Sequence, residues 1–146
     1  MFKTILFPTD GSPLSDKATV TAVQMARLHG ARIIAISVIQ PFPFLPMGDS
    51  GVVVPDAGIY ERQMNDAAER NIAKVGLAAQ QAGVPYEGLV VMSPSPYEEI
   101  VEAAKKHGVD LIVMASHGRS GLNRLLLGSE TQKVLSHTEL PVLILR

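Results

Sequence analysis

The sequence contains no cysteine and no tryptophan, and its net charge at pH 7 is only −1. The missing cysteine excludes disulfide bonds, thiolate metal sites and cysteine catalysis. A nearly neutral chain provides no basic field that would attract nucleic acid. No apolar run reaches membrane-spanning length, and the first residues form no signal-peptide pattern. We therefore expect a cytoplasmic protein that binds neither nucleic acid nor membranes.

What the sequence does contain is an alternation of strand-like and helix-like segments across residues 1–146, of which 47% are apolar and 18% charged. This composition predicts one globular domain. The alternation predicts an α/β fold, an open twisted parallel five-stranded sheet in the order 3-2-1-4-5 with helices on both faces. The expected strands are 2–7, 33–39, 87–92, 110–114 and 141–145, and the expected helices are about 13–29, 58–82, 96–108 and 129–137.

Local signals mark several of the helix ends. Ser12 before Pro13 predicts a helix start, and Gly30 predicts the end of the same helix. The segments 95–98 and 129–132 read Ser-x-x-Glu and Ser-x-x-Gln, which are typical of capping boxes. Apolar residues recur at helical spacing along the longest helix, and we interpret this stripe as core. Its members are Met64, Ala68, Ile72, Val75, Ala79 and Ala82.

A glycine-bearing loop, residues 115–128, joins the fourth strand to the last helix. Glycines let the backbone approach a ligand and take positive φ, and a helix N-terminus favours phosphate. Arg119 and Arg124 add positive charge to the loop. The glycines could instead simply turn the chain, and Ser129 could be an ordinary cap. The loop is neither a P-loop nor a Gly-x-Gly-x-x-Gly dinucleotide fingerprint, because both patterns are absent.

The predicted topology places a second loop beside the loop 115–128. In the order 3-2-1-4-5 the strand order reverses between the first and fourth strands, and ligands bind outside the carboxyl ends of strands at such a point. The segments 8–12 and 115–118 leave those two strands, so they are expected to meet. Asp10 in the first segment could hydrogen-bond a nucleotide or help to hold a divalent metal, or it could be a simple turn residue.

The loop resembles the nucleotide loop of the universal stress protein family, whose ATP-binding branch carries Gly-x2-Gly-x9-Gly-Ser/Thr before the last helix. Gly118, nine residues and then Gly128-Ser129 match this pattern, whereas Ala115 replaces the first glycine. An alanine methyl there could crowd the approach of backbone to phosphate. The resemblance covers the whole chain. It implies a Rossmann-like fold of the adenine nucleotide alpha hydrolase type, with ATP and Mg²⁺ bound between the two loops.

The resemblance also implies roles for individual residues. Gly118, Gly128 and Ser129 would hold phosphates, Asp10 would contact the nucleoside or the metal, and Val38 is similar to a position whose backbone contacts adenine. Ala115 would contribute only its backbone. The full set of predicted nucleotide-binding residues is Pro8, Thr9, Asp10, Val38, Met114, Ala115, His117, Gly118, Arg119, Gly128, Ser129 and Glu130. Asp10 is the one predicted metal ligand.

No catalytic residue is predicted, and at most slow ATP hydrolysis is expected. His117 has no second histidine and no carboxylate pair near it in the sequence, and neither Ser12 nor Ser116 has an evident base. The other histidines lie near predicted helix C-termini, where the helix dipole explains them. Glu98 and Glu99 are better explained as first-turn helix residues than as an acid pair.

Three functions remain open from the sequence. The first is an ATP-binding stress-response regulator whose conformation or dimerisation depends on nucleotide. The second, favoured by Ala115, is a member that binds no nucleotide and acts through protein partners. The third is a slow nucleotide hydrolase. We expect a homodimer through the apolar strand 141–145, whose edge could pair with a second copy. The proline-rich segment 41–58 either covers the ligand, packs on a partner or seals the core edge.

Overall fold

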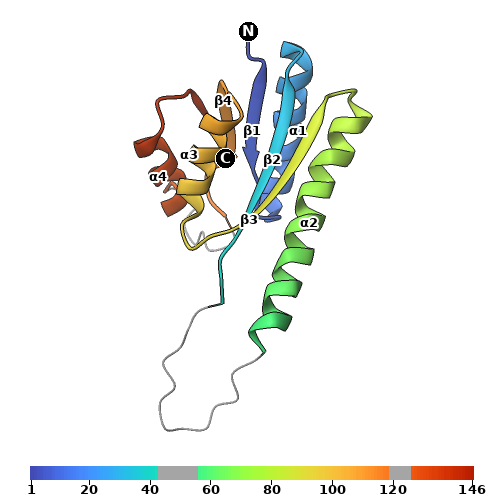
Figure 1. Cartoon of the computed structure of the whole chain (residues 1–146). Coiled ribbons are helices and arrows are strands. Elements are labelled where there is room, and N and C mark those ends of the chain that lie inside the picture. Colours follow the sequence, from blue (N-terminus) through green and yellow to red (C-terminus); the bar gives the residue numbers. More distant parts are fainter. Residues whose placement is uncertain (43–55, 119–125) are drawn as a thin grey trace.

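The computed structural model describes residues 1–42, 56–118 and 126–146. Most of the proline-rich segment 41–58, together with Arg119 and Arg124, lies outside these residues. Strands and helices alternate along the described chain, as the sequence predicts, and the bounds agree within two residues (Figure 1). The elements are β1 (Thr4–Pro8), α1 (Pro13–His29), β2 (Arg32–Ile39), α2 (Ala57–Gln81), β3 (Tyr86–Met92), α3 (Pro96–Lys106), β4 (Leu111–Ala115), α4 (Ser129–His137) and β5 (Val142–Leu145).

The strands form one sheet in the order β3-β2-β1-β4-β5, and every pairing is parallel. This confirms the predicted order. Strand β1 is central, with β2 on one side and β4 on the other, so the order reverses at β1 and β4. The carboxyl ends of these two strands therefore flank the point where such sheets bind ligands.

Helices cover both faces of the sheet. Helices α1 and α2 lie on one face, and α3 and α4 lie on the other (Figure 1). Successive side chains of a strand point to opposite faces. Ile5 and Phe7 of β1 accordingly pack with α1 and α2, whereas Leu6 packs with α3 and α4. All three are fully buried, which explains why the central strand is continuously apolar in the sequence.

The predicted ends of α1 are confirmed. The Ser12 hydroxyl accepts a hydrogen bond from the Ser15 N–H at 3.2 Å, and Pro13 is the first helical residue. Gly30 ends the helix with φ of +61°, a conformation that costs a residue without a side chain little. The turn that leaves β1 is therefore closed by local side-chain contacts.

Both predicted capping boxes are wrong. Gly128, not Ser129, occupies the N-cap of α4, because the Gly128 N–H is anchored to the Ser116 carbonyl and the helix begins directly after it. Ser95 is the N-cap of α3, but its side chain makes no capping hydrogen bond. A carboxylate distant in sequence, that of Glu130, accepts from the Tyr97 N–H instead. Tertiary contact has replaced local capping at both helices.

The amino ends of the strands are tied together by charged side chains. Arg32 donates to the Thr4 hydroxyl at 3.2 Å, to the His107 carbonyl at 2.9 Å and to Glu87 at 3.4 Å. Asp110 accepts from the backbone N–H groups of Lys3 and Thr4 at 2.8 and 3.1 Å. These contacts connect the loops at this end of the sheet and fix its register.

Across the described ranges, no helix combines the length and the hydropathy that a membrane span requires.

Candidate functional site

A cavity of about 530 Å³ lies at the carboxyl ends of β1, β2 and β4. Cavities of this size are typical of small-molecule sites. Eleven of the twelve predicted nucleotide-binding residues line it, and the twelfth, Arg119, lies outside the described residues. The eleven are Pro8, Thr9, Asp10, Val38, Met114, Ala115, His117, Gly118, Gly128, Ser129 and Glu130. The topology therefore brings them to one place, while their role in binding remains a prediction.

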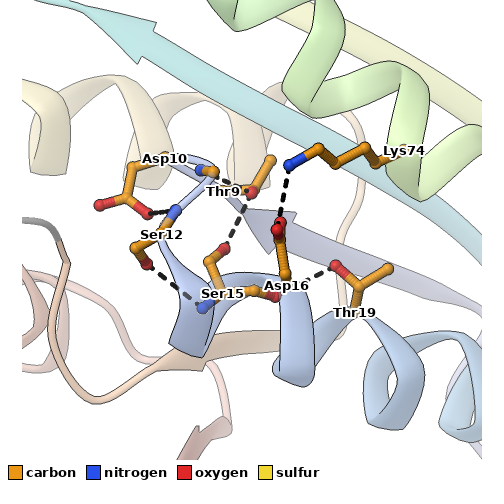
Figure 2. A network of polar contacts seen from close by, with 8 residues as sticks. Thr9, Asp10, Ser12, Ser15, Asp16, Thr19 and Lys74 are labelled. Carbon is orange, nitrogen blue, oxygen red and sulfur yellow. Dashed lines mark hydrogen bonds and ion pairs between the residues drawn. The ribbon is translucent and has the colours of Figure 1, made fainter.

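The segment that leaves β1 is held by its own side chains, as Figure 2 shows. The Thr9 hydroxyl accepts from the Ser15 hydroxyl at 2.8 Å and from the Gly11 N–H at 3.3 Å. The Asp10 carboxylate accepts from the Ser12 N–H through Oδ1 at 2.9 Å. Asp10 is thus the turn residue that one interpretation predicted, and it also lines the cavity. The turn presents its carboxylate to the site in a defined orientation.

Gly118 lies where the two loops meet. A Cβ atom added to Gly118 would lie 2.4 Å from the Asp10 Oδ2 atom, so no larger residue fits there without a shift. Neither Gly118 nor Gly128 has a positive φ, which contradicts the expectation that the loop glycines take that conformation. Any larger residue at position 118 would require the Asp10 carboxylate to move, because the backbone approaches it closely. The contact joins the Asp10 turn to the loop after β4.

The first turn of α4 lines the cavity. The Gly128 N–H donates to the Ser116 carbonyl at 2.7 Å and is therefore used within the protein. The first N–H groups of a helix have no acceptor inside that helix. Here these groups belong to Ser129, Glu130 and Thr131, and all three residues line the cavity. An anion at this position would meet them and the positive end of the helix dipole.

Ala115, where the chain departs from the family pattern, lines the cavity. The Ala115 side chain packs against the apolar cluster between the sheet and helices α1 and α2. Helix α4 packs on the opposite face through Val134. The Ala115 carbonyl accepts from the Thr131 hydroxyl at 3.2 Å, which fixes the strand end against α4. The alanine methyl consequently lies on the opposite face of the sheet from Val134 of α4.

His117 has a neighbour that the sequence analysis did not recognise. Its Nδ1 atom lies 3.1 Å from the Ser116 hydroxyl, so Ser116 does have a potential base next to it. Ser116 is buried, however, and is not among the residues that line the cavity, whereas His117 is. The pair holds the loop after β4 in place, and it does not offer a nucleophile to a ligand.

Helix α2 contributes a wall that sequence reasoning missed. Tyr60, Met64, Ala67, Ala68 and Asn71 all line the cavity. The interpretation of the helical stripe as core is correct from Ala68 onward and wrong for Met64, which is only half-buried. Helical spacing identifies the residues that share this face of α2. It does not show where the sheet under the helix ends and the cavity begins. Asn71 reaches the Gly11 backbone, where an added Cβ would clash with its amide.

The carboxylates of the cavity do not form a metal site by themselves. In the described part of the chain, no three histidine or acidic side chains are grouped closely enough to hold a metal ion. Asp10 and Glu130 are the acidic residues that line the cavity. Mg²⁺ is commonly bound by one or two carboxylates together with substrate phosphates and water. The Asp10 carboxylate therefore fits a Mg²⁺ ion that would share its ligands with phosphate oxygens, whereas the Glu130 oxygens already contact the Tyr97 N–H and Lys133.

These features define an open parallel α/β domain with a ligand-sized cavity where its strand order reverses. The family model described as the universal stress protein family matches residues 1–146, and the chain belongs to that family. A universal stress protein of Thermus aquaticus is 34% identical over 146 residues, which cover 100% of both chains.

Two solved structures are similar to the whole chain. Universal stress protein MJ0577 of Methanocaldococcus jannaschii has a TM-score of 0.82 and 26% identity, covering 99% of this chain and 96% of that chain. A universal stress protein in complex with cAMP has a TM-score of 0.71 and 27% identity, covering 99% of this chain and 97% of that chain. Both likenesses extend across the segments that form the cavity.

Proposed function

We propose that the chain binds an adenine nucleotide, ATP with Mg²⁺, in the cavity, and that occupancy regulates its conformation or dimerisation during stress. The observation that carries the proposal is the junction of the two loops beside α4. Gly118 packs on Asp10, and the first residues of α4, whose N–H groups have no acceptor inside that helix, line the same cavity. The related protein in complex with cAMP supports an adenine nucleotide as the ligand class.

The composition of the cavity suggests how the nucleotide is oriented. The wall formed by Val38, Ile39 and Met64 is apolar and suits a base. Asp10 and the first turn of α4 lie in the polar part and suit the ribose, the metal and the phosphates. The Ser129 hydroxyl and the N–H groups of residues 129–131 would bind phosphate oxygens. Gly128 would act by allowing close packing, because its N–H already donates to Ser116.

The proposal is tested by calorimetric titration of nucleotide-stripped protein with ATP and Mg²⁺. We expect micromolar binding for the native chain and a loss of about 100-fold or more in Gly118→Val, because the new side chain displaces the Asp10 carboxylate. Ser129→Ala should weaken binding by about threefold to tenfold through loss of one hydroxyl donor. Absence of binding up to millimolar ATP in the native chain would refute the proposal.

Gly83→Val provides a control for general destabilisation. Gly83 has φ of +69° and lies between α2 and β3, at the opposite end of the sheet from the cavity. A β-branched residue is strained there, so this variant should also lose stability. It should nevertheless keep the native affinity for ATP. An equal loss of affinity in Gly83→Val and Gly118→Val would mean that the loss reflects unfolding.

We also propose that two copies associate through β5. In the described chain β5 pairs only with β4, and all four of its residues are half-buried. The Pro141 carbonyl accepts from the Ile112 N–H in β4, and the Leu145 carbonyl accepts from the Ser116 N–H directly after β4. Backbone groups alternate in direction along a strand, so the N–H groups of Val142 and Ile144 point to the open edge. An apolar open edge of this kind is suited to pairing with a second copy.

A proline substitution separates edge pairing from side-chain packing. Val142→Pro removes an outward N–H and leaves the bonds to β4 intact, whereas Val142→Ala removes a similar side-chain volume and keeps the N–H. Analytical ultracentrifugation with and without ATP should show a dimer whose dissociation constant rises about tenfold or more in Val142→Pro. A native chain that remains monomeric at every concentration would exclude the dimer and leave the nucleotide site unaffected.

A further inference from the structure

Glu130 connects the candidate site to a second helix. It is the second residue of α4 and lines the cavity. Its Oε2 atom accepts from the Tyr97 N–H in the first turn of α3 at 2.9 Å, and its Oε1 atom lies 3.2 Å from the Lys133 Nζ atom. Ser95, the N-cap of α3, makes no side-chain capping bond. The Glu130 carboxylate therefore caps α3 from outside that helix.

The position of this carboxylate has an electrostatic consequence. Glu130 places one negative charge at the positive ends of two helices, its own α4 and the neighbouring α3. An anion that binds the first turn of α4 needs the same positive potential and comes close to the same carboxylate. Repulsion between them grows with the charge of the anion, while a neutral ligand is unaffected. Lys133 offsets part of the Glu130 charge from the exposed side.

We propose that Glu130 is a specificity-determining residue that lowers the affinity of the cavity for each added phosphate. Its charge reduces the advantage that ATP would otherwise have over AMP, and Lys133 sets how strongly it does so. The inference rests on the proposed nucleotide site. It concerns the charge of the ligand and is independent of how the base is recognised.

Glu130→Gln isolates the charge. The amide oxygen of glutamine can still accept from the Tyr97 N–H, so the contact with α3 is kept while the negative charge is removed. Calorimetric titrations with adenosine, AMP, ADP and ATP are compared at one ionic strength and one Mg²⁺ concentration. In Glu130→Gln we expect affinity for ATP to rise about fivefold to tenfold, affinity for AMP about twofold, and affinity for adenosine not at all.

Glu102→Gln is the matched control. Glu102 is an exposed carboxylate of α3 that is not among the residues lining the cavity, and its substitution changes the net charge by the same amount. We expect all four affinities to remain within about twofold of the native values, since exposed charges away from a site are screened. A graded rise in Glu102→Gln equal to that in Glu130→Gln would overturn the inference, because net charge alone would explain it.

Lys133→Gln keeps the inference testable if Glu130→Gln folds poorly. Removing the ammonium leaves the Glu130 charge less offset, so affinity for ATP should fall about threefold. If Lys133 acts through Glu130, this loss should be smaller when both substitutions are combined. Equal effects in the two backgrounds would refute the assigned role of Lys133.

The outcomes distinguish the inference from the proposed function. If Glu130→Gln changes the affinities for adenosine and ATP equally, or lowers the affinity for ATP, the assigned role of Glu130 is wrong. The proposed nucleotide site would still stand. Failure of the native chain and of Glu130→Gln to bind any of the four compounds would refute the site itself, and the inference with it.

Discussion

The two ends of the sheet are built from the same strands but treat their polar groups differently. At the amino end, Arg32 and Asp110 satisfy neighbouring hydroxyl, carbonyl and N–H groups with contacts of 2.8–3.4 Å. At the carboxyl end, a cavity of about 530 Å³ separates the β1 turn, α2 and the start of α4. At the amino end the strand-end polar groups are paired within the protein, whereas at the carboxyl end Asp10 and the first turn of α4 line a cavity with room for a ligand.

The difference follows from the direction of the chain. In a strand–helix alternation each helix begins near the carboxyl end of the preceding strand, so α1, α3 and α4 all direct their N-termini to that end (Figure 1). Positive helix ends accumulate there, together with first-turn N–H groups that have no acceptor inside their own helix. A bound anion can accept from N–H groups there, as Asp110 accepts from the Lys3 and Thr4 N–H groups at the opposite end. The contacts that fix the strand register and the proposed ligand site therefore lie at opposite ends of one sheet.

Among the substitutions that compare the two ends, the largest effect is expected from Asp10→Ala at the carboxyl end. The substitution removes a cavity carboxylate together with the acceptor of the Ser12 N–H, so affinity for ATP with Mg²⁺ should fall roughly thirtyfold. Asp110→Ala is the matched change at the amino end and should leave that affinity unchanged. Calorimetric titration of both variants provides the test. The comparison fails if the two aspartates affect binding equally.

The next effect is expected from Arg32→Met, which should lower the free energy of unfolding by about 1–2 kcal/mol. Three polar contacts are lost, but the side chain is half-exposed and water replaces part of them. Urea denaturation measures the change, and affinity for ATP should stay within about twofold of the native value. A large loss of affinity with unchanged stability would show that the two ends are not separate in function.

The smallest effect is expected from Tyr86→Phe, at the start of β3. The Tyr86 hydroxyl donates to the Ile72 carbonyl of α2 at 2.6 Å, and its loss should cost about 1 kcal/mol in unfolding experiments. Burial, followed by the nearby Glu69 charge, raises the pKa of Tyr86 above 10.0. A raised folded-state pKa means that this contribution is complete below pH 10.0 and is lost as pH rises through the folded-state value. Tyr86→Phe should therefore lose less stability than the native chain as pH rises above 10.0. An equal loss of stability in the two proteins would contradict this role of Tyr86.

The sequence was sufficient for the features that depend on regular alternation and local turns. Strand order, the Ser12 and Gly30 ends of α1 and the meeting of the two loops were all predicted from patterns that the chain carries locally. Eleven predicted residues share the cavity because parallel topology alone brings strand ends together. The apparent mismatch at Ala115 required the structure, since only the alternation of β4 shows which face its methyl occupies.

The features that sequence reasoning missed depend on contacts between distant segments. Met64 and Ile72 share one helical stripe, but only the extent of the sheet decides that Met64 faces the cavity and Ile72 the core. The Glu130 contact with Tyr97 spans 33 positions and replaces a local cap at Ser95. Spacing within one helix carries no signal for a bond between two helices.

The most direct test of the account is a nuclear magnetic resonance titration of the ¹⁵N-labelled chain with ATP and Mg²⁺. The backbone amide signals of Asp10, Gly118 and residues 129–131 should shift on saturation, whereas those of Arg32 and Asp110 should not. That result would place the nucleotide at the carboxyl end of the sheet, against the first turn of α4. Unchanged spectra up to millimolar ATP, or shifts centred on the amino end, would contradict the proposed site.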